Sequence, residues 1–409
     1  MTIKQSPSDF IVEELLAPEV AAALGERAAA HAVYRLTKEG LTTPDAAATL
    51  ARALGVRPGQ VAYAGLKDRH ARTIQHISVP TAGKADLPAD AEGPGWRAER
   101  IGWTDAPLSA DAIAANRFTI IVRDLSREAC RRMDEAAAML TLTPAPDARD
   151  LTVAARKSEM LFVNYFGDQR FGSARAGRGF LAAHLVRGEF EDALRLAIGV
   201  WGRKDSKRQK EFRRAVAEGW GRWAEILPRL SACPERAAVE HLAAHPDDFA
   251  GAFAALPYGF QELAVHAYQS HLWNATAQRL MTDRCPGAAI TAADPFGEMV
   301  FPAAAGVPAD LATLDLPVLG RDSILREPWK PAAESVLAAE GLTTDRLRIP
   351  DLRRPQFGEA PRPLFARATS FDMSQPQADE THPKRLRRTL SFDLPRGAYA
   401  TVVLRALGE

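Results

Sequence analysis

Alternation of apolar and polar residues predicts short strands in the first third of the chain. Over residues 32–37, Tyr34 and Leu36 fall on one face of an extended segment, whereas Val33 and Arg35 fall on the other. Three further short runs have strand character: residues 61–64, 73–79 and 118–122. These runs alternate with helical patterns, so we expect this part of the chain to mix strands and helices.

Capping residues predict where the first helix begins and ends. Thr43 is a good N-cap, Pro44 suits the first helical position, Leu50 and Leu54 form an apolar stripe, and Gly55 ends the pattern. A second helical pattern covers residues 127–140. Residues 143–147, with two prolines in five positions, read as a connector.

Helical patterns dominate from about Ser158 onward. They cover five stretches: residues 180–186, 191–198, 207–227, 237–244 and 262–280. Strand-like alternation returns at residues 364–371 and 386–392. We therefore predict an α+β protein in which a mainly helical domain, residues 156–355, interrupts a mixed-sheet domain formed by residues 1–155 and 356–409. A serial arrangement of two domains is the alternative.

Composition narrows the class of protein. The 409 residues are 46% hydrophobic and 25% charged, as in ordinary globular proteins, and no apolar run reaches the roughly 20 residues of a membrane span. The N-terminus has no apolar signal-peptide stretch, and the three cysteines are widely separated, so we expect a cytoplasmic protein without a disulfide framework or a cysteine-rich zinc site. The net charge of +1 means that nucleic-acid binding must be argued from local basic clusters.

The segment from Tyr63 to Val79 is the most informative for chemistry. It places Asp68 between Lys67 and Arg69, on a loop that follows Gly65 and joins two predicted strands. Cations within a few ångströms would favour the charged form of this carboxylate. Loops held by rigid strands often carry catalytic groups, although a solvated, self-neutralising loop fits the same residues.

Five segments, in order along the chain, resemble the TruD family of tRNA pseudouridine synthases. The loop resembles the family signature Gly-x-Lys-Asp-(Lys/Arg)-His-Ala, followed by Thr73 and Gln75. The other four are Lys4 with residues 8–13, Asn116-x-Phe118 with Arg123, residues 164–172, and residues 394–405. The resemblance spans residues 4–405, and it implies a pseudouridine-synthase catalytic domain interrupted by a TRUD-type domain.

The resemblance implies a cofactor-independent isomerase that binds tRNA and converts uridine 13 to pseudouridine. Asp68 would act at the ribose, either by attacking C1′ or by removing the C2′ proton, and neither route needs a metal or a redox cofactor. The substrate-binding residues implied in the same way are Lys4, Lys67, Gln75, Asn116, Phe118 and Arg170. We expect a monomer with no membrane partner.

Phe118 and Asn116 have competing structural interpretations. They lie two positions apart and so on the same face of a strand, where both could line one pocket. The resemblance makes Phe118 the residue on which the base stacks, whereas a phenylalanine in a Val/Ile-rich strand is more often part of a core. Phenylalanine also lacks a hydroxyl, so the group that removes the C5 proton is unassigned.

Basic clusters are the candidate tRNA contacts. The first comprises Arg170, Arg175 and Arg178; the second comprises Arg203, Lys204, Lys207, Arg208, Lys210, Arg213 and Arg214; the third comprises Lys384, Arg385, Arg387 and Arg388. A folded RNA would engage at least one of them through its phosphates. For any single cluster, a solvated face is the ordinary alternative. Around Arg170, we expect Tyr165, Phe166 and Phe171 to be packing residues.

Two rival functions are compatible with the sequence. One is an RNA-binding or tRNA-folding protein that has kept the scaffold and lost catalysis, which the intact residues 67–69 and Gln75 disfavour. The other is a hydrolase using Asp68, which would ordinarily need a second carboxylate as the acid. No GxxxxGK[ST] or GxGxxG motif is present, and His241 and His245 do not form an HExxH zinc motif.

Overall fold

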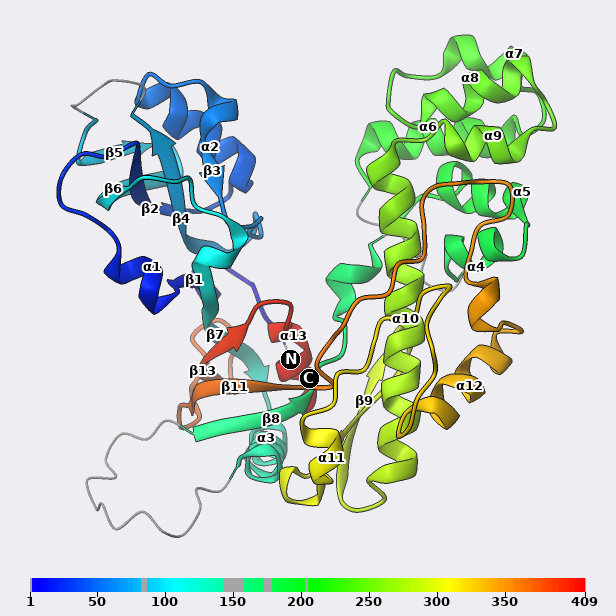
Figure 1. Ribbon diagram of the computed structural model, residues 1–409. Helices are drawn as coiled ribbons and strands as arrows, with labels where there is room; N and C mark the ends of the chain where they lie inside the picture. Colours follow the sequence, from blue (N-terminus) through cyan, green and yellow to red (C-terminus); the bar gives the residue numbers. More distant parts are fainter. Residues whose placement is uncertain (1, 82–86, 143–157, 173–178, 203–204, 409) are drawn as a thin grey trace, which may run out of the picture. The chain divides into compact units, whose positions relative to one another are not determined.

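The chain divides into two compact units in the computed structural model, which describes residues 2–81, 87–142, 158–172, 179–202 and 205–408 (Figure 1). Unit 1 comprises Met1–Phe162 and Ala366–Glu409, and unit 2 comprises Val163–Phe365. The sequence-based boundaries at 155/156 and 355/356 both lie on the N-terminal side of these limits. The expected connector at residues 143–147 lies outside the described residues.

Unit 1 is built on an 11-stranded sheet whose main path runs β5-β6-β2-β4-β1-β7-β13-β11-β8. The strands on this path are β1 (Phe10–Leu16), β2 (His31–Lys38), β4 (Arg72–Pro80), β5 (Asp90–Gly93), β6 (Trp96–Thr104), β7 (Ile113–Leu125), β8 (Ser158–Val163), β11 (Phe365–Met373) and β13 (Leu386–Pro395). The short strands β3 (Ala62–Tyr63) and β12 (Gln377–Ala378) pair with β4 and β13. Strand β1 pairs in parallel with β4 and antiparallel with β7. The sheet is therefore mixed, which confirms the predicted α+β class.

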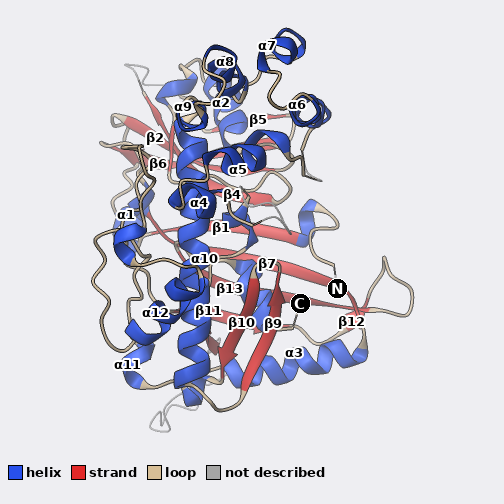
Figure 2. Cartoon of the chain, turned by 90° about the vertical axis from the view of Figure 1, so that its right-hand side faces the viewer, coloured by secondary structure: helices blue, strands red, loops and turns tan. Residues whose placement is uncertain are grey.

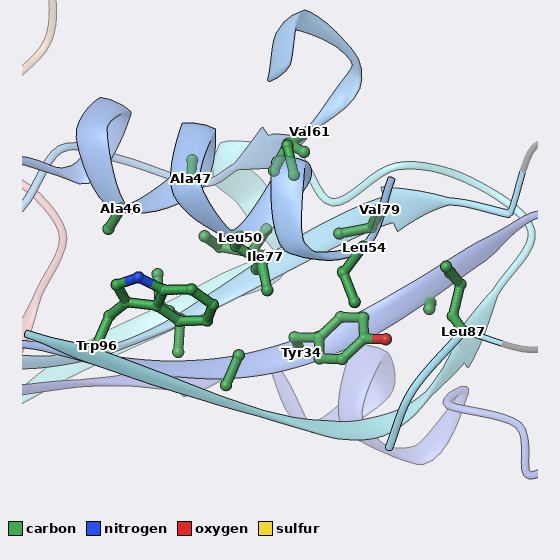
Figure 3. Close-up of a cluster of buried hydrophobic side chains, with 14 of the residues drawn as sticks. Tyr34, Ala46, Ala47, Leu50, Leu54, Val61, Ile77, Val79, Leu87 and Trp96 are labelled. Atoms are coloured by element: carbon green, nitrogen blue, oxygen red, sulfur yellow. The ribbon is translucent and has the colours of Figure 1, made fainter. Parts of the chain in front are cut away.

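Helix α2 (Thr43–Ala53) covers one face of the sheet, over β2, β4 and β6. Figure 3 shows Leu50 and Leu54 of α2 directed at Tyr34 and Ile77, on the face predicted from the alternation of residues 32–37. The predicted N-cap is wrong by one residue. Thr42 is the cap, and its Oγ1 accepts a hydrogen bond from the Asp45 N–H at 3.2 Å.

Three other α-helices belong to the described part of unit 1: α1 (Pro18–Ala22), α3 (Arg127–Leu140) and α13 (Ala400–Ala406). Helix α3 has the predicted bounds and begins after the N-cap Ser126. A buried ion pair fastens the N-terminal segment to β7, because Arg123 Nη2 lies 2.8 Å from Asp9 Oδ1. Arg123 also contacts Asp379 at 3.2 Å, so one guanidinium joins segments from both ends of the chain.

Unit 2 is organised around the 27-residue helix α10 (Tyr258–Arg284). Figure 2 shows the hairpin of β9 (Ala289–Asp294) and β10 (Gly297–Pro302), and β10 packs against this helix. The remaining α-helices among the residues described for unit 2 are α4 (Leu181–Val186), α5 (Phe190–Leu194), α6 (Lys207–Glu218), α7 (Trp223–Ile226), α8 (Arg236–Ala244), α9 (Phe249–Ala254), α11 (Ala309–Ala312) and α12 (Lys330–Ala339). None of the helices in the described residues has the length and apolar character needed to cross a membrane.

Unit 2 departs from the predicted helices at one place and has the predicted core residues at another. The single helix expected at residues 207–227 is two helices, because the chain turns at Gly219 and Gly221. The φ of Gly221 is 85°, in the left-handed region that favours glycine. Tyr268, Leu272 and Trp273 of α10 are buried, as predicted for core residues.

Candidate active site

The loop between β3 and β4, residues 64–71, is fastened at several backbone positions. The Lys67 N–H donates to Thr43 Oγ1 at 2.9 Å, at the N-terminus of α2. The ammonium of Lys38, which is buried, donates to the Asp68 carbonyl at 3.0 Å and to the Leu41 carbonyl at 2.9 Å. A buried cation that replaces water at two carbonyl groups holds the loop in one conformation.

The Asp68 carboxylate stays accessible and ionised within this rigid loop. Its side chain is 36% exposed. One oxygen accepts a hydrogen bond from the His70 N–H at 3.1 Å, and the other forms an ion pair with Lys4. Partial burial raises the pKa of Asp68, but the hydrogen bonds from Lys4 and the His70 backbone outweigh it and leave the pKa below its ordinary value. The carboxylate is therefore an anion at neutral pH.

The cations expected beside Asp68 in the sequence point elsewhere. Lys67 Nζ lies 2.8 Å from Glu14 Oε1 and donates to Asn116 Oδ1 at 2.8 Å. Arg69 Nε donates to the Gly40 carbonyl at 2.9 Å. Both side chains make these other contacts, and Lys4 is the cation that pairs with the Asp68 carboxylate.

Lys4 connects the carboxylate to an aromatic cluster. Its ammonium lies 4.2 Å from the centroid of the Phe10 ring, a cation–π contact that directs the side chain. The Phe10 ring meets Phe118 edge-on with centroids 6.1 Å apart, and Phe118 stacks on Phe392 at 5.7 Å. Phe118 is half-buried, so part of its ring is accessible.

Strand register places the loop and the aromatic cluster over the same face of the sheet. In the antiparallel β1–β7 pair, Glu14 lies opposite Asn116 and Val12 lies opposite Phe118. Directly opposite residues project to the same face, so Asn116 and Phe118 share a face, as predicted. Because Lys67 binds both Glu14 and Asn116, the loop that carries Asp68 crosses this face.

Glu14 is a site residue that the sequence reading missed. Its side chain is 1% exposed, and its Oε2 accepts a hydrogen bond from the His76 N–H at 2.8 Å. Burial raises the pKa of Glu14, but the hydrogen bonds from His76 and the charge of Lys67 outweigh this effect and leave the pKa below its ordinary value. The group is therefore a buried carboxylate anion paired with Lys67. Alternation along β1 was the available signal, because Glu14 follows Phe10 and Val12 at core-facing positions.

Gln75 contacts the loop indirectly, through Thr43. It lies on β4 opposite Leu36 and is fully buried, and its Oε1 accepts a hydrogen bond from Thr43 Oγ1 at 3.0 Å. Thr43 in turn accepts from the Lys67 N–H. In this geometry Gln75 acts on the loop through Thr43, and the predicted direct contact with a substrate is not available to a fully buried side chain.

Arg170 belongs to unit 2, in a short helical turn over Asp168–Phe171. Its Nε donates to Ser270 Oγ at 3.2 Å, and its guanidinium lies 5.6 Å from the Phe166 ring centroid. The neighbouring aromatics Tyr165, Phe166 and Phe171 are buried, as predicted for packing residues.

The basic clusters differ in how much charge they leave free. In the third cluster, Arg388 pairs with Asp134 at 2.7 Å, and Arg385 pairs with Asp124 at 2.6 Å. Arg387 also has an acidic partner within the protein. The proposed RNA contact by this cluster is therefore not supported, since its arginines are engaged in the fold.

The second and first clusters are only partly described. Arg213 is buried and donates to the Val200 carbonyl at 2.8 Å, so it is structural. Lys207 and Arg214 remain exposed on α6. Four further members lie outside the described residues: Arg175, Arg178, Arg203 and Lys204.

The histidine pair set aside in the sequence has a local partner. His241 Nε2 lies 2.7 Å from Asp248 Oδ2, and the Asp248 carboxylate also caps α9 through the Gly251 N–H. This arrangement accounts for His241 without a metal ion.

Comparison with known proteins identifies the family. The family model of tRNA pseudouridine synthase D (TruD) matches residues 1–407. A probable tRNA pseudouridine synthase D 1 of Methanococcus maripaludis is 27% identical over 419 residues, covering 99% of this chain and 98% of that protein. The tRNA pseudouridine synthase D of Aquifex aeolicus is 27% identical over 425 residues, covering 99% and 97%.

A solved structure shares the fold. The crystal structure of a putative tRNA pseudouridine synthase D from Methanosarcina mazei superposes with a TM-score of 0.71 at 23% identity, covering 99% of this chain and 92% of that one. The family match extends over nearly every residue of the chain, from the N-terminal segment that carries Lys4 to the last helix. This chain therefore belongs to the tRNA pseudouridine synthase D (TruD) family.

Proposed function

We propose that this chain is an isomerase that converts uridine 13 of tRNA to pseudouridine, with the Asp68 carboxylate acting at the ribose. Membership of the family supports the reaction and the tRNA substrate. The observation that carries the role of Asp68 is its state in the loop: an anionic carboxylate, accessible to solvent and fixed by Lys4 and the His70 N–H. The position of the uridine in tRNA rests on the resemblance alone.

The reaction breaks the bond between N1 of uracil and C1′ of ribose and forms a bond between C5 and C1′. In the first route, Asp68 attacks C1′ as uracil leaves with the bonding electron pair, and C5 then displaces the carboxylate. In the second route, Asp68 removes the C2′ proton as uracil leaves, which gives a glycal, and returns that proton when C5 bonds to C1′. In both, C5 loses its proton, N1 gains one, and nothing is oxidised.

Both routes require the Asp68 carboxylate to be ionised. The ion pair with Lys4 favours this charged form, so it supports catalysis. A carboxylate held by a cation and a backbone N–H remains charged, and its position does not have to change when the substrate arrives. Lys67, bound to Glu14 and Asn116, fixes the backbone immediately before Asp68. Lys4 therefore fixes the Asp68 carboxylate itself, and Lys67 fixes the backbone that carries it.

The uridine has to leave its stack to reach Asp68, which costs a few kcal/mol. Phe118 is accessible over part of its ring, with Phe10 and Phe392 holding it from two sides. Stacking of a base on an aromatic ring contributes roughly 1–3 kcal/mol, which offsets part of this cost. Because Phe118 has no hydroxyl, the C5 proton must leave to another group or to water.

The test is tritium release from tRNA that carries tritium at C5 of its uridines. Asp68→Asn keeps the size of the side chain but removes its charge and one of its two acceptor oxygens, so we expect tRNA binding without tritium release. Asp90→Asn is the matched control, since Asp90 is an exposed carboxylate on β5 that pairs only loosely with Arg97 at 3.6 Å. Release by Asp68→Asn at the wild-type rate would refute the assigned role, and binding without release by the wild type would favour a non-catalytic scaffold.

A further inference from the structure

Leu66 is an unusually exposed apolar side chain, two residues before Asp68. It is 71% exposed, more than any other large hydrophobic residue in the described part of the chain. The space beside it is open as well, because a Cβ added to Gly65 would meet no atom within 4 Å. Single exposed leucines are common on protein surfaces, but this one lies two residues from the Asp68 carboxylate.

The backbone on the C-terminal side of Leu66 is held in place by hydrogen bonds. The next residue, Lys67, is held by its N–H at Thr43 and by its ammonium at Glu14 and Asn116. The Asp68 carbonyl is then held by the buried Lys38. Leu66 therefore extends into solvent from a backbone that is held on its C-terminal side.

Chain geometry keeps Leu66 beside the reacting nucleotide. Two residues span at most about 7 Å, and in a B-form duplex successive nucleotides of one strand are about 3.4 Å apart along the helix axis. A ribose placed at Asp68 therefore brings Leu66 within about two nucleotide steps of it. Apart from Asp68, the other exposed residues of this loop are Arg69 and His70, which are polar and suit phosphate, whereas a leucine can only contact bases or sugars.

We infer that Leu66 is a wedge that enters the gap left in the RNA stack when the target uridine turns out toward Asp68 and Phe118. This inference rests on the proposed function. Apolar side chains inserted between bases stabilise an opened stack by occupying the space of the missing partner. Leu66 would thus be a positioning residue, which keeps the uridine out of the stack while Asp68 does the chemistry.

The experiment compares full-length wild type with Leu66→Ala, Leu66→Met and the control Ile324→Ala. Ile324 is 69% exposed and lies in unit 2, so it matches Leu66 in size and exposure. Two readouts are measured on unmodified tRNA: kcat/KM for tritium release, and the fluorescence of 2-aminopurine placed next to the target uridine. Melting temperatures are recorded for each variant.

We expect Leu66→Ala to lower kcat/KM about tenfold, equivalent to about 1.4 kcal/mol, and to reduce the fluorescence rise on binding. Leu66→Met should stay near wild type, because methionine fills a similar volume, and Ile324→Ala should match wild type. On a tRNA in which a mismatch already unstacks the target uridine, the kcat/KM of Leu66→Ala should return to the wild-type value, since turning the uridine out of the stack then costs the least free energy.

Four outcomes distinguish this inference from the proposed function. Equal kcat/KM for Leu66→Ala and wild type on ordinary tRNA would overturn the wedge and leave the function intact. An equal loss on the mismatched tRNA, or a melting temperature lowered only in Leu66→Ala, would also overturn it, because the leucine would then not act by opening the stack. No tritium release by wild type would instead contradict the proposed function.

Discussion

The buried ion pair beneath the loop gives the sharpest prediction about the architecture of the site. Glu14 is 1% exposed and its partner Lys67 is 14% exposed, so neither charge is well solvated. In Glu14→Gln the side chain keeps its shape and one acceptor oxygen, but the ammonium of Lys67 loses its counter-charge. The His76 N–H also loses a charged acceptor.

The magnitude follows from what remains after the substitution. Removing one partner of a fully buried ion pair costs about 3–5 kcal/mol. Lys67 keeps its hydrogen bond to Asn116 and some contact with solvent, so we expect a value at the low end, about 3 kcal/mol. The control Glu13→Gln removes a partly exposed pair with Arg35 at 2.8 Å, for which about 0–1 kcal/mol is expected.

Native-state hydrogen exchange at low urea measures these costs within unit 1, through peptides covering β1 and β4. The pH dependence is a second check. The folded pKa of Glu14 is lowered, so its contribution is present above the ordinary glutamate pKa of about 4.3 and is lost as the pH falls through the folded value. The difference between Glu14→Gln and wild type should shrink in acid. Equal costs for Glu14→Gln and Glu13→Gln at pH 7 would refute the buried pair.

Three other substitutions test neighbouring contacts. Lys4→Met removes a cause of the lowered pKa of Asp68, so the acid limb of the kcat/KM profile should move to higher pH; an unchanged limb would contradict the ion pair. Thr43→Val removes the oxygen that accepts from the Lys67 N–H and leaves the buried Gln75 Oε1 without its donor, so we expect kcat in steady-state tritium release to fall together with a loss of about 1–3 kcal/mol in urea unfolding; an unchanged kcat would contradict the role of this contact. Arg123→Leu leaves the buried carboxylates of Asp9 and Asp379 without this cation, and we expect the free energy of unfolding in urea to fall by about 3–5 kcal/mol; a fall of less than about 1 kcal/mol would contradict this.

The sequence predicted elements whose own pattern is strong. Alternation around Tyr34 placed β2 and its buried face, and the helical pattern of residues 127–140 placed α3. It did not predict β5 (Asp90–Gly93), which contains charges and a glycine and is a strand because it pairs with β6. The hairpin of β9 and β10 was missed for the same reason: its extended conformation depends on pairing and on contact with α10.

The candidate site was predictable in its residues and less so in its contacts. Family resemblance singled out Lys4 and Asp68, yet nothing local showed that residues 64 positions apart would form an ion pair. Adjacency in sequence suggested Lys67 as the cation, but successive side chains of an extended loop point in different directions. Glu14 could have been found as a carboxylate in a buried register. Gln75 could not have been placed beneath the loop without the β2–β4 pairing.

The most direct measurement is single-nucleotide mapping of pseudouridine in unmodified tRNA incubated with the purified protein. We predict one new pseudouridine, at position 13, with the wild type and with Asp90→Asn, and none with Asp68→Asn. Pseudouridine formed by Asp68→Asn, or a wild-type protein that leaves every uridine unchanged, would contradict the assignment of the Asp68 carboxylate as the group that acts at the ribose.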